Sequence, residues 1–287
     1  MLTTVASLTI DGLSYGMILF LISSGLTITL GVMRIVNMAH GGFAMIGGYL
    51  ALTAVNKLGV GLFPALAVAV AGTVAIAVVL ERTVYRWVYD ASELGQVLMT
   101  IGLTFIIIAV ITILYNTSLH TLPVPGWLAG NVEIHGVTVS AYRSFLVVLS
   151  GAIAVTLWYA VERTDFGAKL RAAVDNPRMA LCAGINVRRI FSLSFAVGCG
   201  LAAVGGVLGT QMLPLEPFYA TRYLIVVLIV VAVGGLGSLK GSFIAALMVG
   251  LIDTYGRYVL SQGGGFVMYV LVVILLVARP QGLFARA

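Results

Sequence analysis

Long apolar stretches without a single Asp, Glu, Lys or Arg dominate this chain. A helix needs about 20 apolar residues to cross the ~30 Å hydrocarbon core of a bilayer, and most of these stretches approach or exceed that length. The pattern therefore predicts an all-α polytopic membrane protein, with residues 1–287 forming a single transmembrane domain. The uncharged stretches are 12–33, 35–56, 58–80, 94–132, 144–161, 190–215 and 223–239, and the region 241–278 is interrupted only by Asp253 and Arg257.

Composition supports this interpretation and excludes several classes of protein. The chain is 61% hydrophobic and only 9% charged, whereas soluble domains average roughly 25% charged residues. An ordinary cytosolic enzyme of this length would need far more polar surface. The net charge of +6 comes from basic residues scattered between apolar stretches. Nucleic-acid-binding proteins gather such residues in stripes, so we expect membrane lipid as a partner and no nucleic acid.

Two of the stretches are long enough to be divided. Pro123 and Pro125 end any helix in 94–132, because proline cannot donate a helical hydrogen bond. The turn-like sequence 261–265 divides 241–278 in the same way. The chain then has nine candidate segments, and eight full crossings with one partial crossing fit the sequence equally well.

The basic residues also predict an orientation. With the N-terminus outside and nine crossings, twelve of the sixteen Lys and Arg fall on the inner side, and the outer four are Lys57, Arg143, Arg222 and Arg257. Cytoplasmic loops carry an excess of Lys and Arg, so we expect a cytoplasmic C-terminus, which places Arg286 inside. No basic residue precedes Arg34, so the first stretch lacks the charged start of a cleavable signal peptide.

The segment 116–142 is predicted to be an external loop. The alternation of Val132, Ile134, Val137 and Val139 around His135-Gly136 indicates a small β-hairpin, and Pro123, Pro125 and Trp127 are expected at the membrane interface. Two roles stay open for this loop: it binds an external partner, or it only caps the helical bundle.

The segment 162–189 is predicted to be a cytoplasmic loop with helical order. Phe166, Leu170 and Val174 recur at positions i, i+4 and i+8 beside Lys169 and Arg171. This is the pattern of a helix that lies along a surface. A first helix is therefore expected to end near residue 175.

A second, short helix is predicted after Asp175, over 177–183. Asn176 is a good N-cap, Pro177 suits the first helical position, and Gly184 can take the left-handed position after the helix. The helix would display Met179, Ala180 and Cys182. Because isolated helices this short are marginal in water, it must pack on its own bundle or bind another protein, and the caps favour a protein partner.

Two irregular sequences are candidates for a solute path. The first contains Arg34, Asn37, His40, Gly41 and Gly42, and polar clusters of this kind inside a membrane bundle indicate a functional site. The glycine pair is also expected to interrupt the helix and expose backbone groups to a cavity.

The second irregular sequence spans 234–241 and contains Gly234, Gly235 and Gly237. Glycine-interrupted segments in both halves of a chain point to discontinuous helices around a translocation path. Glycines also allow close helix packing, as in the GxxxG pairs Gly12/Gly16, Gly205/Gly209 and Gly237/Gly241. We favour the path for the two clusters and packing for single glycines.

The chemistry of an enzyme or an ATPase is missing from the sequence. No GxxxxGK[ST] loop or HExxH motif occurs, and Cys182 and Cys199 lie in no metal-ligand spacing, so no metal site, cofactor or catalytic residue is predicted. An intramembrane serine protease using His40 stays open by residue type, although no serine has a GxSxG context. An ion-coupled carrier is the stronger rival, but it would need more ionisable groups at mid-membrane.

Several sequence segments in order resemble the permease subunits of bacterial ABC importers for branched-chain (hydrophobic) amino acids, of the LivH type. The resemblance spans nearly the whole chain. It rests on residues 25–27 leading into 35–41, 81–86, 175–177 with 184–186, 234–238, and the ending 279–284.

The resemblance implies a heteromeric importer. A second, homologous permease subunit, two cytoplasmic ATPase subunits that hold ATP and Mg²⁺, and a periplasmic substrate-binding protein are the implied partners. The segment 162–189 would be the coupling element that contacts the ATPases. The implied coupling residues are Asp175, Asn176, Pro177, Met179, Ala180, Gly184 and Ile185.

The chain departs from its relatives at two positions of the first irregular sequence. Relatives often carry Phe at the position of Met38 and an acidic residue at that of Gly42. Similar permeases serve urea, short amides and aromatic acids, so branched-chain amino acids are the first expectation for the cargo and these solutes are the alternatives. Asn37 and His40 are expected to line the path, and Gly41, Gly42, Gly234, Gly235 and Gly237 to shape it.

Overall fold

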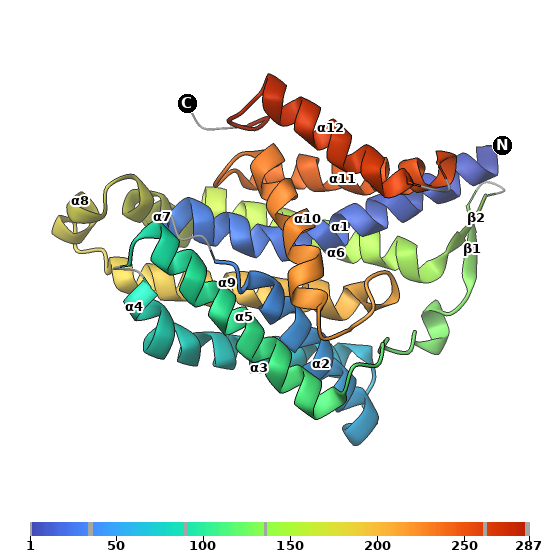
Figure 1. Ribbon diagram of the computed structural model, residues 1–287, viewed down its shortest axis with the longest axis horizontal. Helices are drawn as coiled ribbons and strands as arrows, with labels where there is room; N and C mark the ends of the chain where they lie inside the picture. The colour runs from blue at the N-terminus through green and yellow to red at the C-terminus, as the bar shows by residue number, and fades with distance from the viewer. Residues whose placement is uncertain (1, 34–36, 89–90, 135–136, 261–262, 285–287) are drawn as a thin grey trace.

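The protein is an elongated helical bundle in which most long helices run roughly along one axis (Figure 1). The structure, a computed structural model, describes residues 2–33, 37–88, 91–134, 137–260 and 263–284. The predicted positions Arg34, His135, Gly136 and Arg286, and part of the turn 261–265, lie outside the described residues. The long helices of the described chain are α1 (Leu2–Met33), α2 (His40–Leu58), α3 (Leu62–Leu80), α5 (Glu93–Tyr115), α6 (Ala141–Arg163), α9 (Val187–Leu208), α10 (Tyr219–Gly234), α11 (Leu239–Val259) and α12 (Gly264–Ala278).

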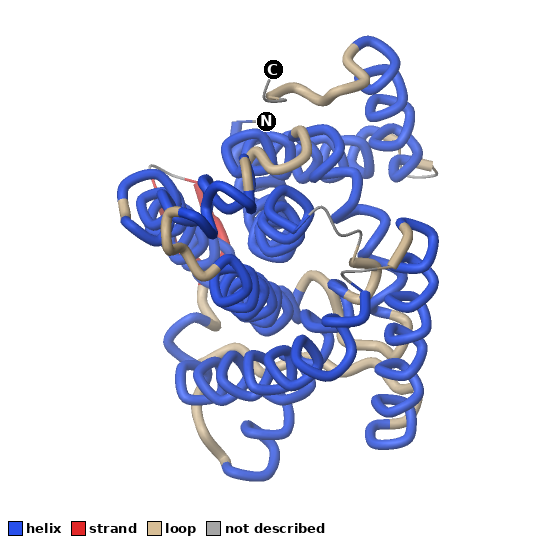
Figure 2. Tube along the Cα trace, turned by 90° about the vertical axis from the view of Figure 1, so that its left-hand side faces the viewer, coloured by secondary structure: helices blue, strands red, loops and turns tan. Residues whose placement is uncertain are grey.

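Short elements connect these helices. Helix α3 continues through the π-helical turn η1 (Glu81–Tyr85) into α4 (Arg86–Val88), and two 3-10 turns, η2 (Gly126–Leu128) and η3 (Gly209–Gln211), occur in connecting segments. The strands are β1 (Asn131–Ile134) and β2 (Val137–Ser140), and helices α7 (Asp165–Asp175) and α8 (Pro177–Cys182) complete the described chain. Figure 2 shows helix almost throughout, with the two strands drawn in red on one side of the bundle.

Within the described residues, five helical regions are long and apolar enough to cross a membrane, which indicates a multi-pass membrane protein. These regions are Thr3–Gly31, Leu62–Tyr85, Glu93–Tyr115, Ala141–Arg163 and Val187–Gln211. Helices α10 and α12 are apolar but shorter, and α10 rises only about 24 Å. The long helices coincide with the predicted segments, while the choice between eight and nine crossings stays a prediction.

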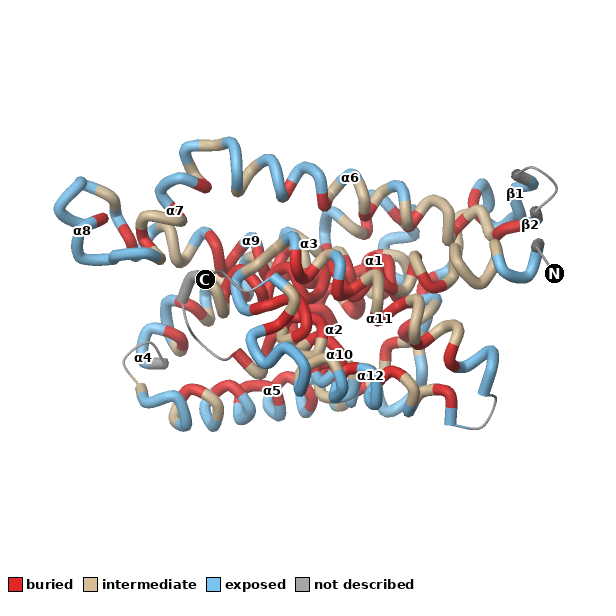
Figure 3. Tube along the Cα trace, turned by 90° about the horizontal axis from the view of Figure 1, so that it is seen from above, coloured by how far each residue is buried: buried red, intermediate tan, exposed pale blue. Residues whose placement is uncertain are grey.

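Helix α1 is the centre of the bundle. Its middle is fully buried, and buried positions gather along α1, α2 and α9, whereas α5 and α6 keep exposed positions along their lengths (Figure 3). Glycines let α1 approach its neighbours closely: a Cβ at Gly16 would lie 2.7 Å from the carbonyl oxygen of Ala246 on α11. Gly25 meets Gly198 of α9 in the same way. The packing role predicted for the Gly12/Gly16 pair is thus confirmed.

The predicted hairpin is present in the segment between α5 and α6. Strands β1 and β2 pair antiparallel, with Val132 opposite Val139 and Ile134 opposite Val137. The Ser7 hydroxyl of α1 donates to the Thr138 carbonyl oxygen at 3.2 Å. The hairpin therefore lies beside the start of α1, at the opposite end of the bundle from α7 and α8 (Figure 1). Following the predicted orientation, we call the hairpin end the outer end and the α8 end the inner end.

Candidate functional site

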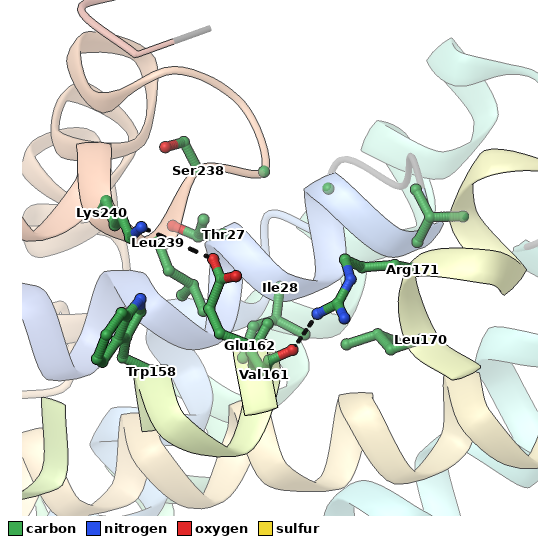
Figure 4. A pocket seen from close by; sticks show the side chains of 13 residues that line it. Thr27, Ile28, Trp158, Val161, Glu162, Leu170, Arg171, Ser238, Leu239 and Lys240 are labelled. Atoms are coloured by element: carbon green, nitrogen blue, oxygen red, sulfur yellow. Dashed lines mark hydrogen bonds and ion pairs between the residues drawn. The ribbon is translucent and has the colours of Figure 1, made fainter. Parts of the chain in front are cut away.

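A cavity at the inner end brings two of the predicted features together. It has a volume of about 270 Å³ and lies between α1, the end of α6, α7 and the turn that joins α10 to α11. Leu170, Arg171 and Val174 of α7 line it, and so do Gly237 and Ser238 of the turn. Figure 4 shows Leu170 and Arg171 on one side and Ser238 on the other. We call this space the inner cavity. The predicted coupling segment and the predicted glycine-rich turn of the solute path therefore face each other across the inner cavity.

The α10–α11 turn depends on its glycines for its conformation. Gly235 and Gly237 have φ values of +95° and +79°, a region that side chains with a Cβ rarely enter. Gly234 packs on the start of α11, where a Cβ would lie 2.5 Å from the Ser242 backbone nitrogen. Gly237 in turn contacts Gly31 near the end of α1. The turn is therefore both a helix break and a contact point with the central helix.

Polar side chains hold the rim of the inner cavity. Lys240 Nζ lies 4.0 Å from Glu162 Oε1 and 5.3 Å from the centre of the Trp158 ring. The Arg171 guanidinium donates to the carbonyl oxygen of Val161, which ties α7 back to the end of α6. Figure 4 shows Glu162 reaching toward Lys240 while Arg171 points at Val161. The rim thus links α6 to both α7 and α11.

The caps predicted for the short helix α8 are confirmed. The Asn176 side-chain oxygen accepts from the Met179 N–H at 3.1 Å, and Pro177 occupies the first turn. At the other end Gly184 has φ +78°, its N–H donates to the Leu181 carbonyl, and the Ile185 N–H donates to the Ala180 carbonyl. These two bonds form a Schellman motif. Local sequence alone therefore fixes both ends of α8.

The predicted exposed face of α8 is partly wrong. Ala180 is only 3% exposed, because it packs with Ala173 of α7 and Val187 of α9. Met179 and Leu181, which flank it, are 67% and 59% exposed. Cys182 is exposed as expected. Helix α8 is thus seated on α7 and α9 through Ala180, and it presents a Met–Leu surface outward.

Two residues beside α8 complete the predicted coupling set. Asp175 is the last residue of α7 and is exposed. Ile185 is half-buried and packs against the small cluster under α8. Both lie where the sequence placed them, directly flanking the short helix.

Asn37 and His40 are buried at the junction where α2 begins. The Asn37 side-chain oxygen accepts from the Tyr85 hydroxyl at 2.8 Å and from the Ala39 N–H at 3.0 Å. His40 Nε2 donates to the Ile22 carbonyl oxygen of α1 at 2.9 Å. Within the described residues, Asn37 Nδ2 and His40 Nδ1 have no hydrogen-bond partner. Neither residue lines the inner cavity, and their place on a solute path stays a prediction.

The adjoining glycine pair serves close packing in this conformation. A Cβ at Gly41 would lie 2.5 Å from the Ala220 carbonyl oxygen of α10, and one at Gly42 would lie 2.9 Å from Ile107 Cδ1 of α5. Helix α2 begins at His40 and runs through both glycines without a break. The predicted interruption of the helix at this pair is therefore wrong. The two glycines instead allow α2 to pack closely against α10 and α5.

Sequence reasoning missed the polar rim of the inner cavity. Trp158, Glu162 and Lys240 lie in different parts of the sequence and carry no motif. Their meeting depends on how α6 and α11 pack, so no local signal could have found them. The structure joins Gly237 to α7 across one cavity, and it places Asn37, His40, Gly41 and Gly42 in a separate buried junction.

Comparison with known proteins adds a family context to this geometry. Residues 8–278 match the family described as branched-chain amino acid transport system / permease component. The chain is 28% identical to the high-affinity branched-chain amino acid transport system permease protein BraD of Pseudomonas aeruginosa, over 96% of this chain and 94% of that protein. It is 24% identical to the corresponding permease protein LivH of Escherichia coli, again over 96% of this chain and 94% of that protein.

Proposed function

Because this chain belongs to the branched-chain amino acid transport system / permease component family, we propose that it is one permease subunit of an ATP-driven importer for branched-chain or other hydrophobic amino acids. Its relatives carry the names of permease proteins of such transport systems over nearly their whole length. The chain is a transport subunit and not an enzyme, and it works together with other subunits of an ABC transporter. It resides in the bacterial inner membrane, with its N-terminus outside and its C-terminus in the cytoplasm.

The observation that carries this proposal is the construction of α8. A helix of six residues is too short to be stable alone, yet this one is capped at both ends and seated through Ala180. It presents Met179 and Leu181 to the outside of the molecule. Exposed apolar side chains on a small, fixed helix are what a groove of a partner protein binds. In the proposed importer this partner is a cytoplasmic ATPase.

A route for the motion follows from the contacts of the inner cavity. Helix α8 continues from α7, and α7 faces the Gly237 turn across that cavity. The turn contacts Gly31 of the central helix. Closure of the two ATPases on ATP would displace α8 and α7 as a rigid unit, and this displacement would reach α1 and α10 through the turn. Alternating access of the solute path is the proposed result.

The solute path itself remains the proposal made from the sequence. Asn37 and His40 would line it, and their unpartnered nitrogens would supply polar groups when the junction opens. Gly41 and Gly42 would shape it on one side, and Gly234, Gly235 and Gly237 on the other. Their tight contacts with α10, α5 and α11 support this, because such contacts are the places where neighbouring helices can slide.

Three kinds of partner complete the proposed importer. A second, homologous permease subunit forms the other half of the pore, and two cytoplasmic ATPases bind ATP and Mg²⁺. A periplasmic binding protein delivers the amino acid. This chain contributes no Walker lysine, since its three lysines follow Asn56, Ala168 and Leu239 rather than glycine.

Uptake into proteoliposomes tests the proposal. The chain is reconstituted with the second permease subunit and the two ATPase subunits of the proposed importer, and radiolabelled leucine is supplied with the binding protein. We expect leucine to accumulate only with ATP, and not when the ATPases carry a substitution that blocks hydrolysis. Accumulation by the isolated chain under a proton or sodium gradient would instead identify an ion-coupled carrier and refute the proposal.

A further inference from the structure

A larger cavity lies at the outer end of the molecule. Its volume is about 890 Å³, and it is open to one side and lined by the first half of α1, Leu119, Arg143 of α6, residues 212–216 and helices α10, α11 and α12. We call it the outer cavity. It lies at the other end of the bundle from the inner cavity, and the proposed function above does not use it. Its lining combines charged, tyrosine and aliphatic side chains.

Three ion pairs line the outer cavity. One of them connects α1 to α6, one connects the 212–216 segment to the nearby start of α10, and one lies within α11. The three negative charges of the acids equal the three positive charges of the arginines, so the paired groups add no net charge to the cavity lining. The pairs are Asp11–Arg143, Glu216–Arg222 at 2.6 Å and Asp253–Arg257 at 2.8 Å.

In two of these pairs the arginine is exposed and the acid lies behind it. The Arg222 and Arg257 side chains are 63% and 67% exposed, whereas those of Glu216 and Asp253 are only 21% and 9% exposed. Each acid therefore positions its arginine, and most of each arginine side chain stays accessible to a solute. Both arginines are among the residues that line the outer cavity.

Both arginines retain capacity for a second carboxylate. Arg222 bonds Glu216 through Nη1 and Arg257 bonds Asp253 through Nε. A guanidinium carries five N–H donors, so each arginine has further donors beyond the one used. Arginine binds carboxylates through parallel, charge-assisted hydrogen bonds. The outer cavity therefore offers two guanidinium groups, one from α10 and one from α11, to a carboxylate.

The remaining walls suit the other parts of an amino acid. Tyr15, Tyr223 and Met268 offer aromatic and aliphatic surface beside the arginines. Asp11 and Glu216 keep part of their carboxylate surface open and can accept from an ammonium group. A neutral set of paired charges with apolar neighbours matches a zwitterion that carries a hydrophobic side chain.

We propose that the outer cavity of this chain is itself a binding site for a zwitterionic, hydrophobic amino acid. Arg222 and Arg257 bind its carboxylate, Asp11 or Glu216 accepts its ammonium group, and the tyrosine and methionine walls contact its side chain. The inference rests on the proposed function, and it adds a solute-binding site at the outer end of this permease chain.

Direct binding of radiolabelled leucine to the purified chain in detergent tests this site. We expect leucine to bind at least tenfold more tightly than leucinamide, which lacks the carboxylate, and more tightly than 4-methylpentanoate, which lacks the ammonium group. The double substitution R222Q/R257Q should weaken leucine binding at least tenfold. The conservative variant R222K/R257K keeps both charges but loses the planar guanidinium groups, so it should give an intermediate loss of leucine affinity. This second variant keeps the test valid if R222Q/R257Q fails to fold.

Lys57→Gln is the matched control, because Lys57 is a predicted outer cation at the end of α2 that does not line the outer cavity. It should bind leucine like the unmodified chain. Normal leucine binding by both arginine variants overturns the proposal. If the variants bind leucine normally but lose affinity for the binding protein, the arginines form a docking surface and the proposal is likewise overturned.

The assay contains no ATP and no partner subunit, so its failure is separable from failure of the proposed function. Absent leucine binding together with intact ATP-driven uptake refutes the site alone. Specific leucine binding without any ATP-driven uptake supports the site and refutes the proposed importer.

Discussion

The two ends of the molecule are built on different principles. At the inner end a short helix is fixed by backbone caps and one buried alanine, and it presents exposed methionine and leucine side chains. At the outer end three ion pairs, one within α11 and two between neighbouring elements, line a cavity of about 890 Å³. A convex apolar surface suits a protein partner, whereas a concave, charge-balanced one suits a small solute. The two proposals made above therefore place mechanical coupling at the inner end and solute binding at the outer end.

Polar substitution of the α8 surface should produce the largest effect. The double variant M179D/L181D places two charges where an apolar groove is expected, so ATP-dependent leucine uptake should fall at least tenfold. Both side chains are exposed, so the fold and leucine binding at the outer end should persist. Cys182→Ser on the same helix is the control and should transport normally. Unchanged uptake by M179D/L181D would remove the coupling role of α8.

Substitution of Gly237 should destabilise the protein more than substitution of another left-handed glycine. Gly237→Ala incurs the left-handed penalty of roughly 1–2 kcal/mol, and its Cβ would also lie 3.0 Å from Gly31 Cα. Gly59→Ala incurs only the first cost, since nothing lies within 4 Å of its Cβ. Thermal unfolding in detergent measures both variants. Equal losses of thermal stability in the two variants would show that the contact between the turn and α1 contributes nothing to stability.

Removal of the α8 cap should have a local effect. Asn176→Ala loses the bond to the Met179 N–H, a change worth about 0.5–2 kcal/mol, and hydrogen exchange over 177–182 should accelerate. Asn186→Ala removes the equivalent cap on α9, but the long packed helix should retain its protection. Similar acceleration in both helices would contradict the view that α8 depends on its caps.

The ion pair at the rim of the inner cavity should give the smallest effect. Glu162 and Lys240 are 4.0 Å apart and largely exposed, and such pairs contribute about 0–1 kcal/mol. Glu162→Gln should therefore leave unfolding nearly unchanged and alter uptake by less than about threefold, because only the link between α6 and α11 is weakened. A complete loss of uptake in a folded protein would show that this pair is a principal part of the coupling route.

The same contrast explains what the sequence could predict. The hairpin and both caps of α8 were predictable, because each depends on residues within a few positions of one another. The nine helical segments followed from the absence of charge. These signals survive in any tertiary arrangement.

The features that sequence reasoning missed depend on packing between distant elements. Asp11 and Arg143 are remote in sequence and meet only because α1 lies beside α6. Ala180 was expected to be displayed, but α7 and α9 cover it. The glycine pair after His40 was expected to break a helix, and close contacts with α10 and α5 use it instead. No local pattern specifies which neighbour covers a face.

Labelling of the native cysteines tests the central claim most directly. Cys182 is exposed on α8 and Cys199 is buried, so a membrane-impermeant maleimide has one accessible target. The account predicts labelling of Cys182 in inside-out vesicles of the isolated chain, none in right-side-out vesicles, and protection once the ATPase subunits are bound. Labelling from the outer side, or undiminished labelling in the assembled complex, would contradict it.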